Sequence, residues 1–250
     1  NRNMADAALE LIERALLMAP TDYETVLVKA HILSQTGRAT EAIALYDVIL
    51  AATENEQVRI RRATAYIVIG EMEKAVEEFD KILRKSPDSV GGLSGMALAL
   101  EDLGDFQKAL NYHARALELE RDAITLLNYG RCLHQLGRDA EALPLFDEMI
   151  TLNNTDSLAY SCRGISLKAM NRFEESIAAL KASLSLREDP GTATHLAMAY
   201  RSAGYIDEPL GLLRATISSN PTHLAAYLYL GHTYYELERY TDALEVYDSG

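Results

Sequence analysis

The sequence predicts an all-α protein, built as a solenoid of tandem helical hairpins, and three observations favour this fold class. A segment of 14 residues recurs along the chain, as in GEMEKAVEEFDKIL from Gly70 and GDFQKALNYHARAL from Gly104. Apolar residues within each copy follow the three- and four-residue spacing of an amphipathic helix. No run alternates valine or isoleucine with polar residues, so strands are not expected.

A small residue marks the second helix of each copy, five positions after a glycine in the clearest copies. Successive members of this column are separated by 34, 33, 34, 33, 34, 33 and 34 residues: Ala8, Ala42, Ala75, Ala109, Ala142, Ser176, Pro209 and Ala243. A ring or another bulky side chain follows four residues after each one. A fixed period of this length indicates hairpins that bury their apolar faces against their neighbours. We therefore expect Ala75 and Ala109 to be fully buried where helices cross.

The repeat divides the whole chain, which we interpret as one solenoid over residues 1–250. Six complete copies are expected at 23–55, 56–89, 90–122, 123–156, 157–189 and 190–223. Residues 1–22 correspond to the second helix of an earlier copy, and residues 224–250 to a further partial copy. Neither end resembles the polar capping helix that closes a natural array. We therefore interpret the chain as a piece of a longer protein.

Departures from the repeat predict local features. Asn171 replaces the glycine between the two helices of the fifth copy, and asparagine tolerates the left-handed conformation there. Pro144 lies inside a second helix and should bend it or remove a hydrogen bond. Gly91, Gly92 and Gly95 fall in one first helix, and glycine costs about 1 kcal/mol relative to alanine in a helix interior. We expect that helix to be the softest first helix of the array.

The last copy carries a recognisable pattern, formed by Tyr227, Leu230, Gly231, Tyr234, Ala243 and Tyr247. It resembles the tetratricopeptide repeat, whose signature is aromatic-x2-Leu-Gly-x2-Tyr followed by Ala-x3-aromatic. The resemblance covers essentially the whole chain. It implies a right-handed superhelical solenoid whose first helices line a concave groove. It names no partner, because the family binds many unrelated proteins. The pentatricopeptide alternative, a nucleic-acid reader, fits poorly with the acidity and the period.

The composition of the chain disfavours some classes of binding partner. The chain holds 37 Asp plus Glu against 24 Lys plus Arg, a net charge of −13, which argues against nucleic acid or an anionic membrane as the partner. No apolar run approaches the ~18 residues of a membrane span, so direct membrane insertion is not expected. No signal peptide is visible, which favours the cytoplasm, although the chain begins at Asn1 and not at methionine. Cys132 and Cys162 form no metal or redox motif and are interpreted as small residues in packed helices.

No enzyme motif occurs in the sequence. A phosphate-binding glycine loop, HExxH and GxSxG are all missing, and no two histidines lie four residues apart. We therefore predict a protein that is not an enzyme, with no catalytic residues, no metal site and no cofactor. The carboxylate pairs Glu77–Glu78 and Glu174–Glu175 are interpreted as solvated faces of second helices.

Charge differs between the two kinds of helix. The first fourteen residues of the seven first-helix segments hold eight cations and five acids, a net charge of +3, whereas the rest of the chain carries −16. Several polar residues recur at the sixth, ninth and twelfth places of the first helices. His134, Lys168 and Arg201 share the twelfth place in three successive copies. The predicted partner-binding residues are Arg61, Asn128, Arg131, His134, Lys168, His195, Arg201, Tyr229 and His232.

These residues predict a non-enzymatic scaffold that binds a peptide or a partner helix in the groove. Their charge favours a partner that presents acidic groups. The Lys and Asn clamp of chaperone-binding family members is missing, and Asn128 alone represents the asparagine ladder of glycosyltransferase-type members. Two alternatives stay open: a substrate-recruiting arm of a larger enzyme, for example a glycosyltransferase, and a self-assembly module.

Overall fold

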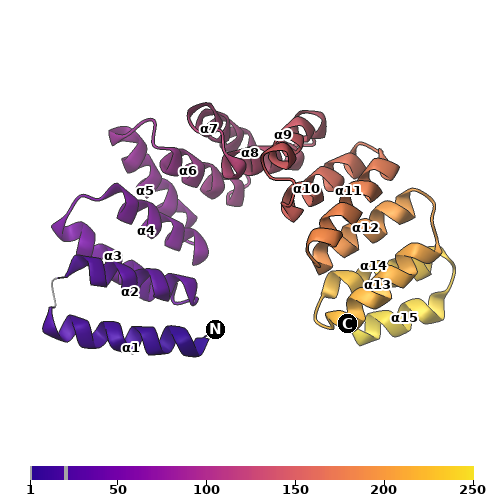
Figure 1. Ribbon diagram of the computed structural model, residues 1–250, viewed down its shortest axis with the longest axis horizontal. Helices are drawn as coiled ribbons and strands as arrows, with labels where there is room; N and C mark the ends of the chain where they lie inside the picture. Colours follow the sequence, from indigo (N-terminus) through magenta and orange to yellow (C-terminus); the bar gives the residue numbers. More distant parts are fainter. Residues whose placement is uncertain (1, 20–21) are drawn as a thin grey trace. The chain divides into compact units, whose positions relative to one another are not determined.

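The structure is a computed structural model that describes residues 2–19 and 22–250 (Figure 1). Over these residues the chain forms fifteen α-helices and no strand, which confirms the predicted all-α class. The helices are α1 Arg2–Met18, α2 Tyr23–Gln35, α3 Ala39–Ala52, α4 Glu56–Val68, α5 Met72–Lys85, α6 Val90–Asp102, α7 Phe106–Leu119, α8 Ala123–Gln135, α9 Asp139–Leu152, α10 Ser157–Ala169, α11 Phe173–Leu186, α12 Pro190–Ser202, α13 Asp207–Ser219, α14 Leu224–Glu236 and α15 Tyr240–Ser249.

The chain divides into two compact units, residues 1–125 and 126–250, called the N-terminal and the C-terminal unit. In the N-terminal unit, each helix from α1 to α7 packs on the next, and α4 also packs on α6. In the C-terminal unit, each helix from α9 to α15 packs on the next. The first helix α12 there also contacts both α10 and α14. First helices α4 and α6 of the N-terminal unit, and α10, α12 and α14 of the C-terminal unit, therefore lie beside one another. The division of the chain into repeat copies stays a prediction.

The small-residue column lies where helices cross. Ala75 and Ala109 are completely buried, as predicted, and so are Ala42, Ala142 and Ser176. The bulky column is buried with it: Tyr46, Phe79, His113, Phe146, Leu180 and Leu213 are each at most 1% exposed. A side chain no larger than a methyl or hydroxymethyl group lets two helices approach closely, and the bulky group four residues later fills the space beside them.

Glycines in first helices make room for these bulky side chains. A Cβ added to Gly130 would lie 2.7 Å from the ring of Phe146, and one added to Gly231 would lie 2.4 Å from Tyr247. In α6 the glycine sits one hairpin further on, since Gly95 packs against Phe79 of the preceding hairpin. These glycines are therefore required by close packing as well as tolerated by the helix. The predicted softness of α6 stays a prediction.

The turns between paired helices use left-handed residues. Gly37, Gly70, Gly104, Gly137 and Gly204 have φ between 70° and 90°. Asn171 has φ 59°, which confirms its predicted role in place of glycine. Glu238 takes the same conformation in the last hairpin, which the sequence did not suggest. Helix α9 continues through Pro144, which has no N–H to donate to the preceding turn.

None of the helices in the described ranges, 2–19 and 22–250, combines the length and the apolar character that crossing a bilayer requires. Cys132 is buried and Cys162 is half-buried, and neither forms a disulfide within the described residues. This placement agrees with their interpretation as small residues in packed helices.

Candidate functional site

Several first-helix cations face a neighbouring second helix. Lys29 donates to Glu13 at 2.9 Å, Arg163 donates to Asp147 at 2.6 Å, and Arg62 pairs with Asp47. All three cations hold the seventh place of a first helix, and each acid directly follows the bulky position of the preceding second helix. Sequence reasoning missed these pairs. Opposite charges 15 or 16 residues apart at those two places are the signal that could have found them.

Glu78 corrects the prediction that the Glu77–Glu78 pair is a solvated face. Its side chain is 6% exposed and accepts hydrogen bonds from Arg59 at 3.1 Å, from Lys81 at 2.7 Å and from Arg62. Burial opposes ionisation of Glu78, but the hydrogen bonds from Arg62 and Lys81 outweigh it, so its pKa lies below the ordinary value. Glu77 is exposed as expected. The difference arises because Glu78 faces α4, where Arg59 and Arg62 lie on the side of the helix that contacts α5.

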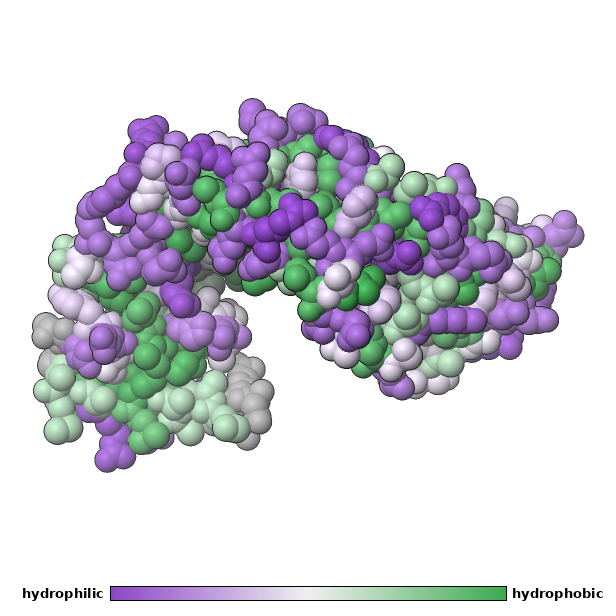
Figure 2. Space-filling view, turned by 45° about the horizontal axis from the view of Figure 1, so that its top comes forward, coloured by the Kyte–Doolittle hydropathy of each residue, from purple (hydrophilic) through white to green (hydrophobic). Residues whose placement is uncertain are grey.

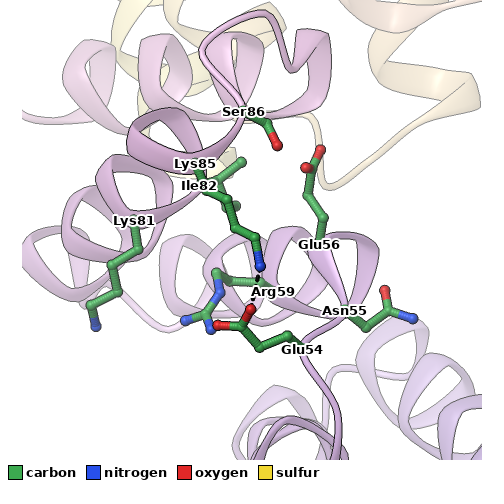
Figure 3. A pocket seen from close by; sticks show the side chains of 8 residues that line it. All are labelled: Glu54, Asn55, Glu56, Arg59, Lys81, Ile82, Lys85 and Ser86. Atoms are coloured by element: carbon green, nitrogen blue, oxygen red, sulfur yellow. Dashed lines mark hydrogen bonds and ion pairs between the residues drawn. The ribbon is translucent and has the colours of Figure 1, made fainter.

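A cavity of about 170 Å³ in the N-terminal unit is surrounded by charged side chains (Figure 3). Its lining consists of Glu54, Asn55, Glu56, Arg59, Lys81, Ile82, Lys85 and Ser86. Lys85 pairs with Glu54, and Glu56 accepts a hydrogen bond from Ser89 at 2.7 Å. Arg59 and Lys81 are both held by Glu78. Because its charges are satisfied within the protein, this cavity is a weak candidate for binding a charged ligand.

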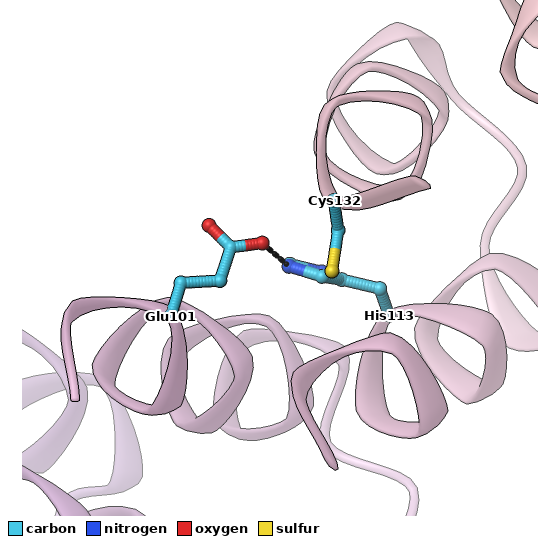
Figure 4. Close-up of side chains that lie close together, drawn as sticks. All are labelled: Glu101, His113 and Cys132. Atoms are coloured by element: carbon cyan, nitrogen blue, oxygen red, sulfur yellow. Dashed lines mark hydrogen bonds and ion pairs between the residues drawn. The ribbon is translucent and has the colours of Figure 1, made fainter. Parts of the chain in front are cut away.

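Glu101, at the twelfth place of α6, also has its hydrogen-bond partner within the chain. Glu101 lies 3.0 Å from Nε2 of His113, and the two side chains point toward each other (Figure 4). A carboxylate can only accept, so Nε2 of His113 carries the proton. His113 is 1% exposed. Its ring therefore fills the bulky position of its hairpin while Glu101 supplies the partner that a buried imidazole needs.

The predicted partner-binding residues are split between the units. Arg61 lies in the N-terminal unit, exposed on α4, with Nη1 3.1 Å from Nδ1 of His31 on α2. The other eight lie in the C-terminal unit. Asn128 is half-buried on α8, and Tyr229 is partly buried against the core cluster to which α12, α13, α14 and α15 contribute.

A second cavity, of about 250 Å³, opens in the C-terminal unit and is here called the Ser166 cavity. Helices α8, α9, α10 and α12 line it with Arg131, His134, Gln135, Phe146, Cys162, Ile165, Ser166 and His195. It brings three predicted residues together, namely Arg131, His134 and His195. Cys162 and Ser166 were missed because neither carries charge, although Cys162 holds the same sixth place as Asn128 and His195.

Two polar atoms of the Ser166 cavity are buried without a partner among the described residues: Oγ of Ser166 and Nδ1 of His195. Ser166 is 0% exposed. Burial, with the positive charge of Lys168 and the nearby His134, holds the pKa of His195 below its ordinary value and so favours the neutral imidazole. Burial also raises the pKa of the Cys162 thiol to about 11. The cavity thus holds uncharged hydrogen-bonding groups at its wall.

The twelfth-place residues His134, Lys168 and Arg201 have different surroundings. Nδ1–H of His134 donates to Asp139 at 2.6 Å. Arg201 lies 2.7 Å from Nδ1 of His232. It also lies 3.5 Å from Glu236. Within the described residues, Nζ of Lys168 lies 3.9 Å from the sulfur of Met198, and burial together with the charge of Arg201 lowers its pKa.

Two cations are left without an acidic partner beside the Ser166 cavity. Over residues 2–19 and 22–250, no carboxylate forms an ion pair with Arg131 or with Lys168. Arg131 is exposed on α8 and Lys168 is half-buried on α10. They are therefore the cations best placed to meet an acidic group from outside the chain.

Comparison with known proteins places this arrangement in a family. Family models described as "Tetratricopeptide repeat" match residues 2–59, 57–89, 95–157 and 195–250. The chain belongs to the tetratricopeptide repeat family. This assignment confirms the resemblance seen in the sequence.

Two curated tetratricopeptide repeat proteins illustrate the relationship. Tetratricopeptide repeat protein 1 of Schizosaccharomyces pombe is 28% identical over 144 residues, which is 54% of this chain and 13% of the relative. The tetratricopeptide repeat and J domain-containing co-chaperone DNJ1 of Fusarium oxysporum is 24% identical over 87% of this chain and 45% of the relative. The chain spans less than half the length of either relative.

Solved structures share the fold at low identity. The Cut9–Hcn1 hetero-tetramer of the APC/C contains a chain with TM-score 0.75 and 16% identity, covering 96% of this chain and 48% of that one. YrrB, described as a TPR protein with an unusual peptide-binding site, has TM-score 0.57 and 19% identity over 72% of this chain and 94% of its own. These likenesses support a solenoid of tetratricopeptide repeat hairpins.

The place of the chaperone clamp in this tetratricopeptide repeat protein holds no charged residue. At the fifth place of α10 and α12 stand Ser161 and Thr194, which are both buried. Ser161 shares a hydrogen bond with Thr192 at 3.1 Å, and Thr194 donates to the carbonyl of Pro190 at 2.8 Å. Both hydroxyls are therefore engaged inside the helix stack.

Proposed function

We propose that the chain is a non-enzymatic scaffold that binds an extended peptide or a helix of a partner protein along α8, α10, α12 and α14. The observation that carries the proposal is the position of Arg131 and Lys168. They lie beside the Ser166 cavity with no acidic partner in the described chain. Cations elsewhere on the first helices, such as Lys29 and Arg163, find acids on a neighbouring helix.

An unpaired, half-buried cation favours a partner of opposite charge. The burial that lowers the pKa of Lys168 also disfavours its charged form, and a carboxylate close to it would restore that form. In a chain with net charge −13, a cation left unpaired indicates that its partner comes from elsewhere. We therefore expect the bound segment to present acidic groups.

The spacing of the first helices suits an extended segment. Packed helices lie ~10 Å apart, and an extended chain advances ~3.3 Å per residue. A peptide lying across α8, α10 and α12 would therefore meet a new first helix about every third residue. YrrB has the same fold and is described as having a peptide-binding site, which supports the idea that hairpins of this kind can hold a peptide.

The proposal is tested by selecting binders from a displayed library of random peptides and measuring their affinity for two variants. Lys168→Ala combined with Arg131→Ala removes the two cations beside the Ser166 cavity that form no ion pair within the described chain. We expect a loss of about 2–4 kcal/mol in binding free energy, from ~1.5–3 kcal/mol for each charged hydrogen bond discounted for exposure. Arg163→Ala, whose guanidinium is held by Asp147, is the matched control and should bind as the wild type does.

Added salt should weaken the same complexes, because exposed charge pairs are screened. Wild-type affinity in the folded double variant, or peptides selected without acidic residues, would contradict binding at this face.

Self-assembly is a second candidate, and exposed apolar side chains at the end helices favour it. On α1, Leu11 and Leu17 are 65% and 83% exposed, and Figure 2 shows hydrophobic side chains along this helix between the two grey patches. On α14 and α15, Leu228 and Leu244 are 51% and 63% exposed. Light scattering over a range of concentrations decides this point, and a constant monomer mass would exclude self-assembly.

A further inference from the structure

We propose that the Ser166 cavity is a subsite for one acidic side chain, an aspartate or a glutamate, of the segment that binds along the first helices. The inference rests on the proposed function and adds the chemistry of one contact. It follows from the size of the cavity, from its unpartnered polar atoms and from the charges around it.

The cavity is large enough for such a side chain. Its volume is about 250 Å³. Engineered protein cavities of about 150 Å³ already hold benzene. A glutamate side chain has fewer heavy atoms than benzene, so the Ser166 cavity can take it whole. The two methylene groups of that side chain would then contact Phe146 and Ile165.

Two polar atoms in the wall of the cavity have no hydrogen-bond partner among the described residues. Oγ of Ser166 and Nδ1 of His195 are buried with no partner in the part of the chain that the structure describes. Buried polar groups in folded proteins nearly always have a partner. The serine hydroxyl is a donor, and the imidazole donates from Nδ1 in one of its two tautomers. A carboxylate that reaches these two atoms would supply the acceptor that each of them lacks.

The charges around the cavity favour an anion over a neutral amide. Arg131 lines the cavity, and the positive charge of Lys168 lowers the pKa of His195 in its wall. None of the eight lining residues is acidic. The carboxylate of Asp139, next to the lining, already accepts from His134 at 2.6 Å. A charge-assisted hydrogen bond to Arg131 would therefore add to those from the wall.

The test uses small probes and NMR spectra of the whole chain. N-acetyl-glutamate N-methylamide presents one acidic side chain, its glutamine analogue removes the charge, and N-acetyl-alanine presents a terminal carboxylate instead. We expect the glutamate probe at millimolar concentration to shift the signals of Ser166, His195 and Cys162 in a saturable way. The glutamine probe should leave them unmoved, and N-acetyl-alanine should bind more weakly.

Variants then locate the contact. Ser166→Ala should fold normally, because the lost hydroxyl has no partner, and should weaken the glutamate probe about tenfold, which corresponds to about 1.4 kcal/mol. Arg131→Gln should weaken it to a similar extent. Arg163→Gln on α10 removes a cation outside the cavity and should leave the affinity unchanged.

Each contrary outcome has a separate meaning. Equal binding of the glutamine probe, or wild-type affinity in Ser166→Ala and Arg131→Gln, would overturn the carboxylate subsite. Binding of N-acetyl-alanine alone would overturn the side-chain assignment and identify a chain terminus as the source of the carboxylate. If no probe moves these signals while selected peptides still bind the chain, the subsite fails and the scaffold function stands.

Discussion

The ring of Phe79 occupies the space that a side chain at residue 95 would need. A Cβ added to Gly95 would lie 2.2 Å from Cε1 of that ring, and Phe79 itself is completely buried. Helix α6 thus approaches α5 at a distance that only glycine allows.

Gly95→Ala should therefore destabilise the protein by about 1–3 kcal/mol, because the clash exceeds the gain of about 1 kcal/mol in helix propensity. Gly211 provides the matched control, since it lies inside α13 with nothing within 4 Å of an added Cβ. Gly211→Ala should stabilise the protein by up to about 1 kcal/mol. Chemical denaturation measures both, and equal effects of the two changes would contradict the packing role of Gly95.

Glu78→Gln should destabilise the N-terminal unit by about 2 kcal/mol. The change removes the charge that accepts hydrogen bonds from Arg59, Arg62 and Lys81, and each charged hydrogen bond contributes ~1.5–3 kcal/mol before the loss is shared. Glu77→Gln, one residue earlier on the exposed side of α5, should be nearly neutral. Urea titrations of the two variants check this, and comparable midpoints would show that Glu78 is not held as described.

Glu78 also makes the stability of the protein depend on pH in the acid range. Its folded pKa is lowered, so its contribution is present above the unfolded value near 4.3 and is lost as pH falls through the folded pKa. The stability difference between wild type and Glu78→Gln should therefore shrink below about pH 4. A difference that persists unchanged in acid would have another cause.

His195 should titrate below 6.5 in the folded protein, because burial and the charge of Lys168 disfavour its protonated form while Asp189 only partly offsets them. Lys168→Met removes one of these causes and should raise the pKa of His195, with burial still holding it below the ordinary value. NMR titration of the imidazole measures the pKa in both proteins. An unmoved pKa would mean that Lys168 does not reach the cavity wall.

The sign of the accompanying stability effect follows from the direction of this shift. The unfolded chain binds the proton at His195 more readily than the folded chain, so stability should fall as pH drops below about 6.5. The fall should be smaller in Lys168→Met, and an equal fall in both would count against coupling between the two side chains.

Ala142→Leu should destabilise the C-terminal unit by about 1–3 kcal/mol, because Ala142 is completely buried at a helix crossing and the larger side chain overpacks it. Ala140 lies on the same helix, α9, but is exposed, so Ala140→Leu should change little. Thermal melts of the pair check the register of the repeat. Equal melting temperatures would contradict the small-residue column.

The sequence by itself determined the fold class, the period and the buried columns. These follow from local chemistry repeated many times: helical spacing of apolar residues, a left-handed residue between helices such as Asn171, and a small residue such as Ala75 where a larger one would clash. Each copy repeats the same information, so single departures do not obscure it.

The tertiary structure decided the partner of each polar side chain. Glu77 and Glu78 are neighbours in sequence, yet one is solvated and the other is buried beneath two arginines of α4. Likewise Lys168 and Arg163 lie on one helix, but only Arg163 meets an acid. The rotation of each helix against its neighbour decides such pairings, and an angle of one residue, about 100°, changes which side chains can touch. The Ser166 cavity depends on four helices at once, so the pattern within any single copy could not reveal it.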